Sequence, residues 1–180
     1  CGVMTIRHLE PLPDDDVVAL KQLAAQIGLA VYLQPGGPDT IVPLDERMVL
    51  TYALPAQGLE LGFEPADFTQ VNPGINRSMV SQALAWLQPE ALDGVLDLFC
   101  GMGNFTLPVA KLQARVLGVE GSASAVRRAE ANARASGLSH CEFEVADLNN
   151  EATCRKYLGR GYEGLLLDPP RAGAAAAMAA

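Results

Sequence analysis

In the second half of the chain, short apolar runs alternate with segments whose apolar residues recur at helical spacing. The run at 95–99 is followed by two glycines one residue apart and then by a helical pattern at 107–112. Further strand-length runs lie at 115–120, 141–145 and 162–167. Strands that alternate with helices through short links form a parallel sheet, so this half predicts an α/β fold.

The first 72 residues carry a different pattern, which predicts a small α+β unit. A helix is expected from Asp14 to about Gly28, because glycine suits the left-handed position that ends a helix. Its apolar residues form one stripe: Val17, Leu20, Leu23, Ala24 and Ile27. The acids Asp14–Asp16 are interpreted as a solvated cap rather than a metal site. Strands are expected at 3–8, 29–33, 48–54 and 59–63, the last two joined by a hairpin around 55–58.

The segment from Pro65 to Asn72 is too polar for a strand core and is bounded by prolines. A helix at about 75–87 follows it, and Trp86 in this helix is interpreted as a packing residue at a domain edge. We therefore divide the chain into a small α+β portion at 1–72 and an α/β domain at 73–180.

The glycines at 101 and 103 indicate a ligand crevice. At the carboxyl end of a buried strand, glycine permits backbone dihedrals closed to other residues and lets a ligand approach the main chain. Thr106 replaces the third glycine of a dinucleotide-binding turn, which disfavours a pyrophosphate ligand. Glu120 ends the next strand, where an acid can accept hydrogen bonds from both hydroxyls of a ribose. The combination favours an adenosine-containing ligand without phosphates.

Acidic residues end or follow three of the predicted strands. Glu120, Asp147 and Asp168 should therefore reach the same end of one sheet, which is the layout of a binding crevice. Asp97 is the exception, because it lies inside its strand. For Asp147, a helix cap after the strand is the alternative role. Asp168 precedes two prolines, which should hold it rigidly at the lip of the crevice.

Composition and charge narrow the possible functions. Of the 180 residues, 49% are hydrophobic and 19% are charged, as in a soluble globular protein, and the formal net charge is -8. No segment reaches the ~18–20 apolar residues of a membrane span, and the start lacks a secretory layout, so we expect a cytoplasmic protein. The cysteines Cys1, Cys100, Cys141 and Cys154 form no Cys-x-x-Cys pair, so neither a zinc site nor a disulfide framework is indicated.

The glycine turn also carries a family resemblance. Leu-Asp-Leu-Phe-Cys-Gly-Met-Gly-Asn-Phe-Thr-Leu-Pro at 96–108 resembles the cofactor-binding motif of the RNA 5-methyluridine methyltransferases, which use S-adenosylmethionine. Three further matches lie at 63–72 (Phe-Glu-Pro-Ala-Asp-Phe-Thr-Gln-Val-Asn), 118–121 (Gly-Val-Glu-Gly) and 168–173 (Asp-Pro-Pro-Arg-Ala-Gly). Within this family, the chain is most similar to the enzymes that methylate a uridine of 23S ribosomal RNA. The resemblance implies a Rossmann-like class I methyltransferase sheet, parallel and truncated, with strand order 3-2-1-4.

The same resemblance suggests how a bound S-adenosylmethionine would be held. Glu120 should hold the ribose, and Asp147 should lie beside the adenine amino group, which needs an acceptor. Gln70 inherits a cofactor contact from the family. The methionine part should be lined by Phe99 and by the backbone of the turn that contains Gly101, Gly103 and Asn104, with Asp168 at the lip of the crevice.

Methylation of carbon-5 of uracil needs a covalent step, in which a cysteine thiolate adds to carbon-6 and a base later removes the carbon-5 proton. In the family, both the cysteine and the glutamate base lie downstream of the Asp-Pro-Pro-Arg motif, and this chain ends soon after Arg171. We therefore expect a fragment without catalytic residues, in which Cys100 is a small buried hydrophobe. The resembled 23S ribosomal RNA enzyme carries an iron–sulfur cluster on cysteines nearer its amino terminus. No cysteine cluster in this chain matches it, so such a cluster is expected only in a full-length protein.

The acidic charge is unusual for an RNA enzyme, because phosphate contacts need clustered Lys and Arg. We expect ribosomal RNA to be bound mainly by parts absent from this chain; the oligomeric state is left open. Two alternatives remain: a transfer RNA uridine-5 methyltransferase, and a non-catalytic small-molecule-binding domain of the same fold.

Overall fold

A four-stranded parallel sheet organises the second part of the chain. Its strands are β6 (Val95–Leu98), β7 (Val116–Glu120), β8 (Cys141–Val145) and β9 (Gly164–Leu167), in the order β8-β7-β6-β9. All three neighbouring pairs are parallel, and Asp97 on β6 is aligned with Gly118 on β7 and Leu166 on β9. The predicted order 3-2-1-4 is confirmed, and β9 lies at one edge of the sheet as expected.

The computed structural model describes residues 2–113 and 115–180, which form two compact units. One unit consists of the chain up to Thr51 together with Gly62–Phe68, and the other of Tyr52–Leu61 together with Thr69–Ala180. The domain boundary at residue 72 stays a prediction, and residues 52–61 pack with the second unit.

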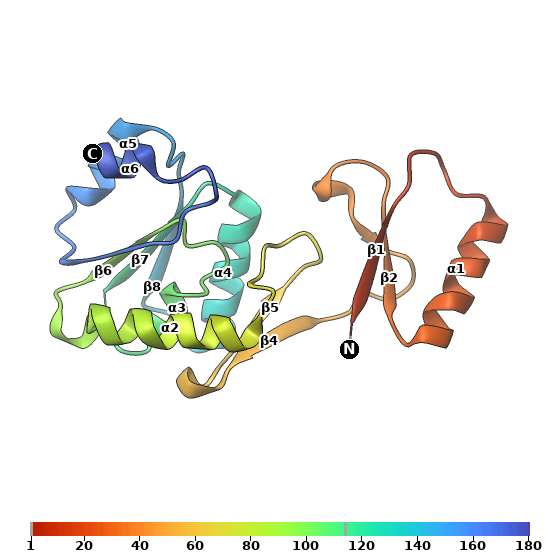
Figure 1. The fold of residues 1–180 in the computed structure, drawn as a ribbon, viewed down its shortest axis with the longest axis horizontal. Helices are drawn as coiled ribbons and strands as arrows, with labels where there is room; N and C mark the ends of the chain where they lie inside the picture. The colour runs from red at the N-terminus through yellow and green to blue at the C-terminus, as the bar shows by residue number, and fades with distance from the viewer. Residues whose placement is uncertain (1, 114) are drawn as a thin grey trace. The chain divides into compact units, whose positions relative to one another are not determined.

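Helices cover both faces of the parallel sheet (Figure 1). They are α2 (Pro73–Leu87), α3 (Thr106–Ala110), α4 (Ala123–Ala135), α5 (Glu151–Leu158) and α6 (Ala175–Ala179), with a short 3-10 turn at Pro89–Ala91. Side chains at three helix starts accept a hydrogen bond from the first turn: Asn72 for α2, Ser122 for α4 and Asn150 for α5. Of the two serines at the start of α4, Ser122 is the cap, and the alanine-rich tail forms α6.

The sheet buries apolar side chains on both faces. On β6, Val95 belongs to one cluster, with α2, α3 and α4, while Leu96 and Leu98 belong to the other, with α5 and α6. This two-sided burial explains why β6, β7 and β9 are almost continuous apolar runs, whereas β8 at the other edge alternates apolar and acidic residues.

A β-hairpin contributes to the first of these clusters. It consists of β4 (Leu50–Leu54) and β5 (Leu59–Phe63), joined by a 3-10 turn at Pro55–Gln57 and by Gly58, whose φ is 61°. Leu54, Leu59 and Leu61 are buried against the same cluster as Val80 of α2. The hairpin predicted around 55–58 is therefore confirmed.

The first unit is built on a β-α-β arrangement. Parallel strands β1 (Val3–Arg7) and β2 (Ala30–Gln34) are connected by α1 (Asp14–Ile27), and the short strand β3 (Val42–Pro43) pairs antiparallel with β2. A 3-10 turn lies at Pro38–Thr40. The predicted strands and helix are confirmed to within about two residues, whereas β3 was not predicted because two residues carry no periodicity.

One prediction about α1 is wrong in detail. The apolar stripe is only partly covered, since Val17, Leu20 and Ala24 are half-buried while Leu23 is 40% exposed and Ile27 is 45% exposed. The acids occupy the first turn, and the N-cap position belongs to Pro13, which makes no side-chain cap. Carboxylates in the first turn still interact favourably with the helix dipole.

Trp86 also differs from its predicted role, because its side chain is 78% exposed on α2 instead of packed at a domain edge. Across the described residues, no helix combines the length and the apolar character needed to cross a membrane.

The close packing around Gly118 predicts that adding one methyl group there lowers the free energy of unfolding. A Cβ at Gly118 would lie 2.8 Å from the Phe143 ring and 2.9 Å from Cys100 Sγ, whereas one at Gly121 would have 3.7 Å to its nearest neighbour. We expect Gly118→Ala to lower the free energy of unfolding by about 1–3 kcal/mol, because overpacking displaces buried side chains. Gly121→Ala should cost less than ~0.5 kcal/mol. Urea unfolding of the 180-residue chain measures both, and equal losses would contradict the packing described here.

Candidate functional site

The carboxyl ends of the parallel strands bring the predicted acids to one edge of the sheet. Glu120 is the last residue of β7, Asp168 directly follows β9, and Asp147 lies two residues beyond the end of β8. The glycine turn starts at the same end of β6. Crevices at this edge of parallel α/β sheets bind ligands.

The turn after β6 has an unusual backbone. Phe99, Gly101 and Gly103 all have positive φ angles, of 66°, 54° and 92°. The turn is fastened to β7 by two hydrogen bonds, since the amides of Phe99 and Cys100 both donate to the carbonyl oxygen of Val119 at 2.9 and 3.1 Å. A Cβ at Gly101 would meet no atom within 4 Å, so this glycine leaves an open approach to the main chain.

Phe99 is strained by this geometry, because a positive φ is rare for a bulky residue. The strand alternation would place its side chain on the same face as Val95 and Asp97. Instead, Phe99 packs with the cluster of Leu96 and Leu98 on the opposite face. The positive φ thus turns the side chain over at the point where the strand ends.

Glu120 makes a hydrogen bond to the glycine turn, with which it was predicted to form one ligand site. Its Oε2 accepts a hydrogen bond from the amide of Gly101 at 3.2 Å, and its Oε1 accepts one from the amide of Ser122 at 2.8 Å. A carboxylate has about four acceptor positions, so both oxygens keep capacity for a ligand. This contact brings the glycine turn and the acid of the next strand into one site.

The other predicted residues have different surroundings. Asp147 is exposed, and its Oδ1 accepts hydrogen bonds from the backbone and side-chain amides of Asn149, so it shapes the turn before α5. Asp168 is half-buried, and burial raises the pKa of its carboxyl. Gln70 is half-buried in the irregular segment that precedes α2.

Asn104 is held by two residues that the sequence analysis missed. Its Oδ1 accepts hydrogen bonds from the Tyr52 hydroxyl and from Asn76 Nδ2, and its own Nδ2 donates to Asn76 Oδ1, all at 2.9 Å. The pKa of Tyr52 is raised by burial. The hairpin and α2 therefore fix the far end of the glycine turn. A polar Asn76 four residues before the buried Val80 was the available signal.

A second contact that was not predicted joins β6 to α3, the two elements that the glycine turn connects. Asp97 is 1% exposed, and its Oδ2 accepts a hydrogen bond from the Thr106 hydroxyl at 2.6 Å. Among the described residues, its Oδ1 has no hydrogen-bond partner. Burial raises the pKa of Asp97 to about 7, opposed by the Thr106 hydrogen bond and reinforced by the charges of Asp168 and Glu120.

The described cysteines are not activated nucleophiles. Burial raises the pKa of Cys100 well above its ordinary value and that of Cys141 to about 12. The thiol of Cys154 donates to the carbonyl oxygen of Leu148 at 3.3 Å, and burial raises its pKa as well. Cys1 lies outside the described residues. Within residues 2–113 and 115–180, no group of three or more His, Cys, Asp or Glu side chains could hold a metal ion.

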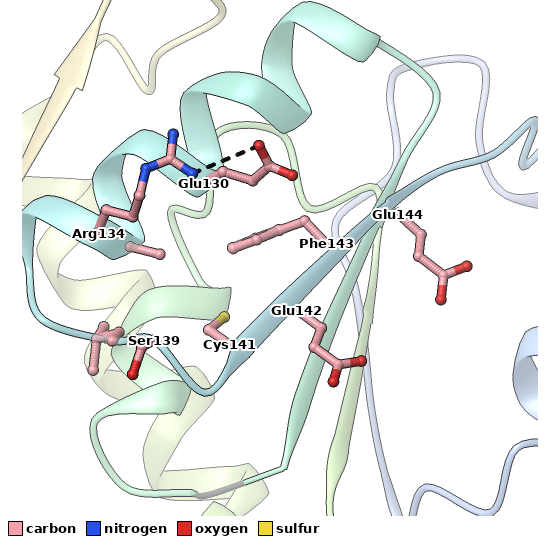
Figure 2. A pocket seen from close by; sticks show the side chains of 9 residues that line it. Glu130, Arg134, Ser139, Cys141, Glu142, Phe143 and Glu144 are labelled. Atoms are coloured by element: carbon pink, nitrogen blue, oxygen red, sulfur yellow. Dashed lines mark ion pairs between the residues drawn. The ribbon is translucent and has the colours of Figure 1, made fainter.

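A surface hollow of about 520 Å³ lies elsewhere, between α4 and β8 (Figure 2). Its rim carries an ion pair between Arg134 and Glu130 at 3.9 Å, and Cys141, Glu142 and Phe143 line its floor along β8. None of the eight predicted ligand residues lines this hollow. We therefore place the candidate site at the strand ends, where the predicted groups meet, and not at this hollow.

A family model, individual protein sequences and a solved structure all match this chain. The model of the family described as tRNA (Uracil-5-)-methyltransferase matches residues 6–179. A protein of Hahella chejuensis named 23S rRNA (uracil(1939)-C(5))-methyltransferase RlmD is 51% identical over 178 residues, which cover 95% of this chain and 40% of that protein. A protein of the same name from Stenotrophomonas maltophilia is 47% identical over 173 residues, covering 96% of this chain and 39% of the relative.

Among solved structures, the chain is similar to a Pyrococcus abyssi tRNA (uracil-54, C5)-methyltransferase in complex with S-adenosyl-L-homocysteine. The TM-score is 0.61 at 22% identity, covering 81% of this chain and 36% of that one. At this identity, the similarity supports the fold. The chain spans about two fifths of the length of the curated relatives described above.

The Asn104 contacts predict that Tyr52 supports the glycine turn. Tyr52→Phe removes a donor to a part-buried amide oxygen, so we expect the free energy of unfolding to fall by about 0.5–1.5 kcal/mol. Tyr162→Phe is the matched control, because that ring stacks under Arg115 and its hydroxyl has no hydrogen-bond partner among the described residues. Thermal or urea unfolding measures the difference. A Tyr52→Phe variant as stable as the control would remove Tyr52 from the support of the turn.

Proposed function

Because the chain belongs to the tRNA (uracil-5-)-methyltransferase family, we propose that it forms the S-adenosylmethionine-binding part of an enzyme that methylates carbon-5 of a uridine in 23S ribosomal RNA. The observation that carries the proposal is the contact between Glu120 and the amide of Gly101. It joins a ribose-binding acid to a turn whose backbone is open to a ligand. The names of the relatives at 45–51% identity support the reaction and the RNA.

The residues at the strand ends fit S-adenosylmethionine. Its ribose hydroxyls are donors that match the acceptor capacity of Glu120, and its adenine amino group is a donor suited to Asp147. The helix after the turn, α3, has only five residues and carries no third glycine at Thr106, so the site does not resemble a pyrophosphate cradle. When bound, the cofactor would supply a methyl group carried on a sulfonium sulfur.

In this proposal, the cofactor ligands are those predicted from the sequence. Phe99, Gly101, Gly103 and Asn104 border the methionine part, Glu120 holds the ribose, Asp147 lies beside the adenine, and Asp168 lies at the lip of the crevice. Gln70 makes a further contact with the cofactor. The side chain of Asn104 is occupied by Tyr52 and Asn76, so its backbone is the group available to a ligand. The chain's own residues thus bind and orient the cofactor.

The RNA class is inferred from the relatives. Ribosomal RNA is favoured over transfer RNA because the proteins named for 23S rRNA share 45–51% of this sequence, whereas the structure named for transfer RNA shares 22%. With a net charge of -8, the chain has little positive surface for phosphates, so RNA contacts are assigned to other parts of a longer protein. A small-molecule-binding domain of the same fold is the second candidate, favoured by this charge alone.

The first test concerns the cofactor. Glu120→Ala should weaken S-adenosylmethionine binding by about 2 kcal/mol, or roughly 30-fold in Kd, because two ribose donors lose a charged acceptor. Glu120→Gln should lose less, since one carbonyl oxygen remains as an acceptor. Glu142→Ala, an exposed acid on β8, is the matched control and should leave the Kd unchanged. Isothermal calorimetry on the 180-residue chain measures all three, and equal losses from Glu120→Ala and Glu142→Ala would remove Glu120 from the site.

The second test separates binding from catalysis. We expect the 180-residue chain to bind S-adenosylmethionine but to transfer no methyl group to RNA, because burial raises the pKa values of Cys100, Cys141 and Cys154 and leaves no ready thiolate among the described cysteines. Labelled cofactor and unmodified 23S ribosomal RNA provide the assay, with the full-length Hahella chejuensis relative as positive control. Methyl incorporation by the chain alone would contradict the expectation, and its loss in Cys100→Ala would identify Cys100 as the nucleophile.

A chimera sharpens this test. The chain replaces the matching 178-residue segment of the Hahella chejuensis relative, and the chimera is offered 23S ribosomal RNA and transfer RNA separately. Methylation of ribosomal RNA, abolished by Glu120→Ala in the chimera, is the expected result. A folded chimera that binds the cofactor but methylates neither RNA would favour the second candidate function.

A further inference from the structure

The carboxyl group of Asp97 is buried with less hydrogen bonding than an ionised carboxylate requires. It is 1% exposed in the middle of the sheet, and its hydrogen bonds come from one residue, Thr106, whose hydroxyl reaches Oδ2 and whose backbone also lowers the pKa of Asp97 by hydrogen bonding. Its Oδ1 has no partner among the described residues. Glu120, in contrast, accepts hydrogen bonds from two backbone amides at the carboxyl end of β7. A buried ionised carboxylate without a counter-charge is costly, so Asp97 favours its neutral form.

The groups that face Asp97 from the neighbouring elements reinforce this preference. Glu120 at the end of β7 and Asp168 after β9 are acids whose negative charges oppose ionisation of Asp97. Cys100, just after β6, is a buried thiol, and Cys141 on β8 is a half-buried one. Burial raises the pKa of both thiols, and the charge of Asp97 adds to this effect. Helix α3 contributes the uncharged Thr106 hydroxyl. Each charged group named here is acidic.

We propose that Asp97 carries a proton in the free protein and releases it to solvent when S-adenosylmethionine binds at the strand ends. This inference rests on the proposed cofactor site. The step is balanced as an ionisation, in which the O–H bond of the Asp97 carboxyl breaks, the electron pair stays on the carboxylate and the proton passes to the buffer.

The burial of Asp97 determines whether a bound cofactor raises or lowers the pKa of its carboxyl. A ligand can raise the pKa of a carboxyl by removing water from it, or lower the pKa by bringing positive charge near it. Asp97 has almost no exposed surface left to lose. The cofactor carries an ammonium, a sulfonium and a carboxylate, so its net charge is positive through the sulfonium, and this net positive charge is the effect that remains. Asp168 is only partly buried, so for this carboxyl the loss of water opposes the effect of the charge.

The proposal predicts how proton release and cofactor affinity change with pH. Because the free carboxyl has a pKa of about 7, proton release should be largest below that pH and absent well above it, where Asp97 is already ionised. Affinity for the cofactor should therefore rise with pH up to about 7 and then level off. S-adenosylhomocysteine lacks the sulfonium charge and should release a smaller fraction of a proton.

Calorimetry in buffers of different ionisation enthalpy counts the protons released on binding. For the 180-residue chain at about pH 6.5, we expect roughly 0.3–0.8 proton released with S-adenosylmethionine, less with S-adenosylhomocysteine, and close to none at about pH 9. Asp97→Asn keeps an acceptor for Thr106 and cannot ionise, so it should bind with no release near pH 6.5. Glu142→Gln is the control and should behave like the unmodified chain.

Two further measurements keep the proposal testable if Asp97→Asn does not fold. Thr106→Val removes the hydrogen bond that lowers the pKa of Asp97, so proton release should extend to higher pH. The comparison of the two ligands needs no variant at all. Binding of S-adenosylmethionine without proton release would overturn the inference while leaving the proposed function intact, as would undiminished release in Asp97→Asn. Failure of both ligands to bind would overturn the proposed function and this inference with it.

Discussion

The site depends on one carbonyl oxygen, that of Val119, which accepts hydrogen bonds from the amides of both Phe99 and Cys100. These bonds hold the chain in a positive-φ turn as it leaves β6. Because the turn is fixed there, the side chain of Phe99 is placed on the opposite face of the sheet from Asp97, and the amide of Gly101 is directed at Glu120. The strain at Phe99 is offset by packing and by neighbouring hydrogen bonds, as is usual at functional sites.

The sheet could be predicted from the sequence because burial of a strand is visible in its amino-acid composition. Strands covered on both faces are continuous apolar runs, and short links between strand and helix permit few topologies. Local chemistry marked the helix start at Ser122 and the end of α1 at Gly28, since both effects act within a few residues. The edge that gathers Glu120 and Asp168 follows from strand direction alone.

Other features could not be predicted, because they depend on residues far apart in the sequence. Tyr52 and Asn104 are separated by 52 positions, and nothing local to either one indicates their hydrogen bond. The exposure of Trp86 was missed for a related reason, since periodicity tells which side of a helix is apolar but not whether another element covers it. A partner for each side chain is a property of the fold.

The acids at the strand ends differ in solvation, and this difference separates their roles. Glu120 accepts hydrogen bonds from two backbone amides, and in the proposed site its remaining acceptor capacity serves the ribose hydroxyls. Asp97, inside the neighbouring strand, is almost fully buried and receives its hydrogen bonds from Thr106, so under our proposal its ionised form is stabilised when the cationic cofactor binds. Because a pyrophosphate would add negative charge beside both, the same solvation that prepares the crevice for a sulfonium ligand also disfavours a dinucleotide.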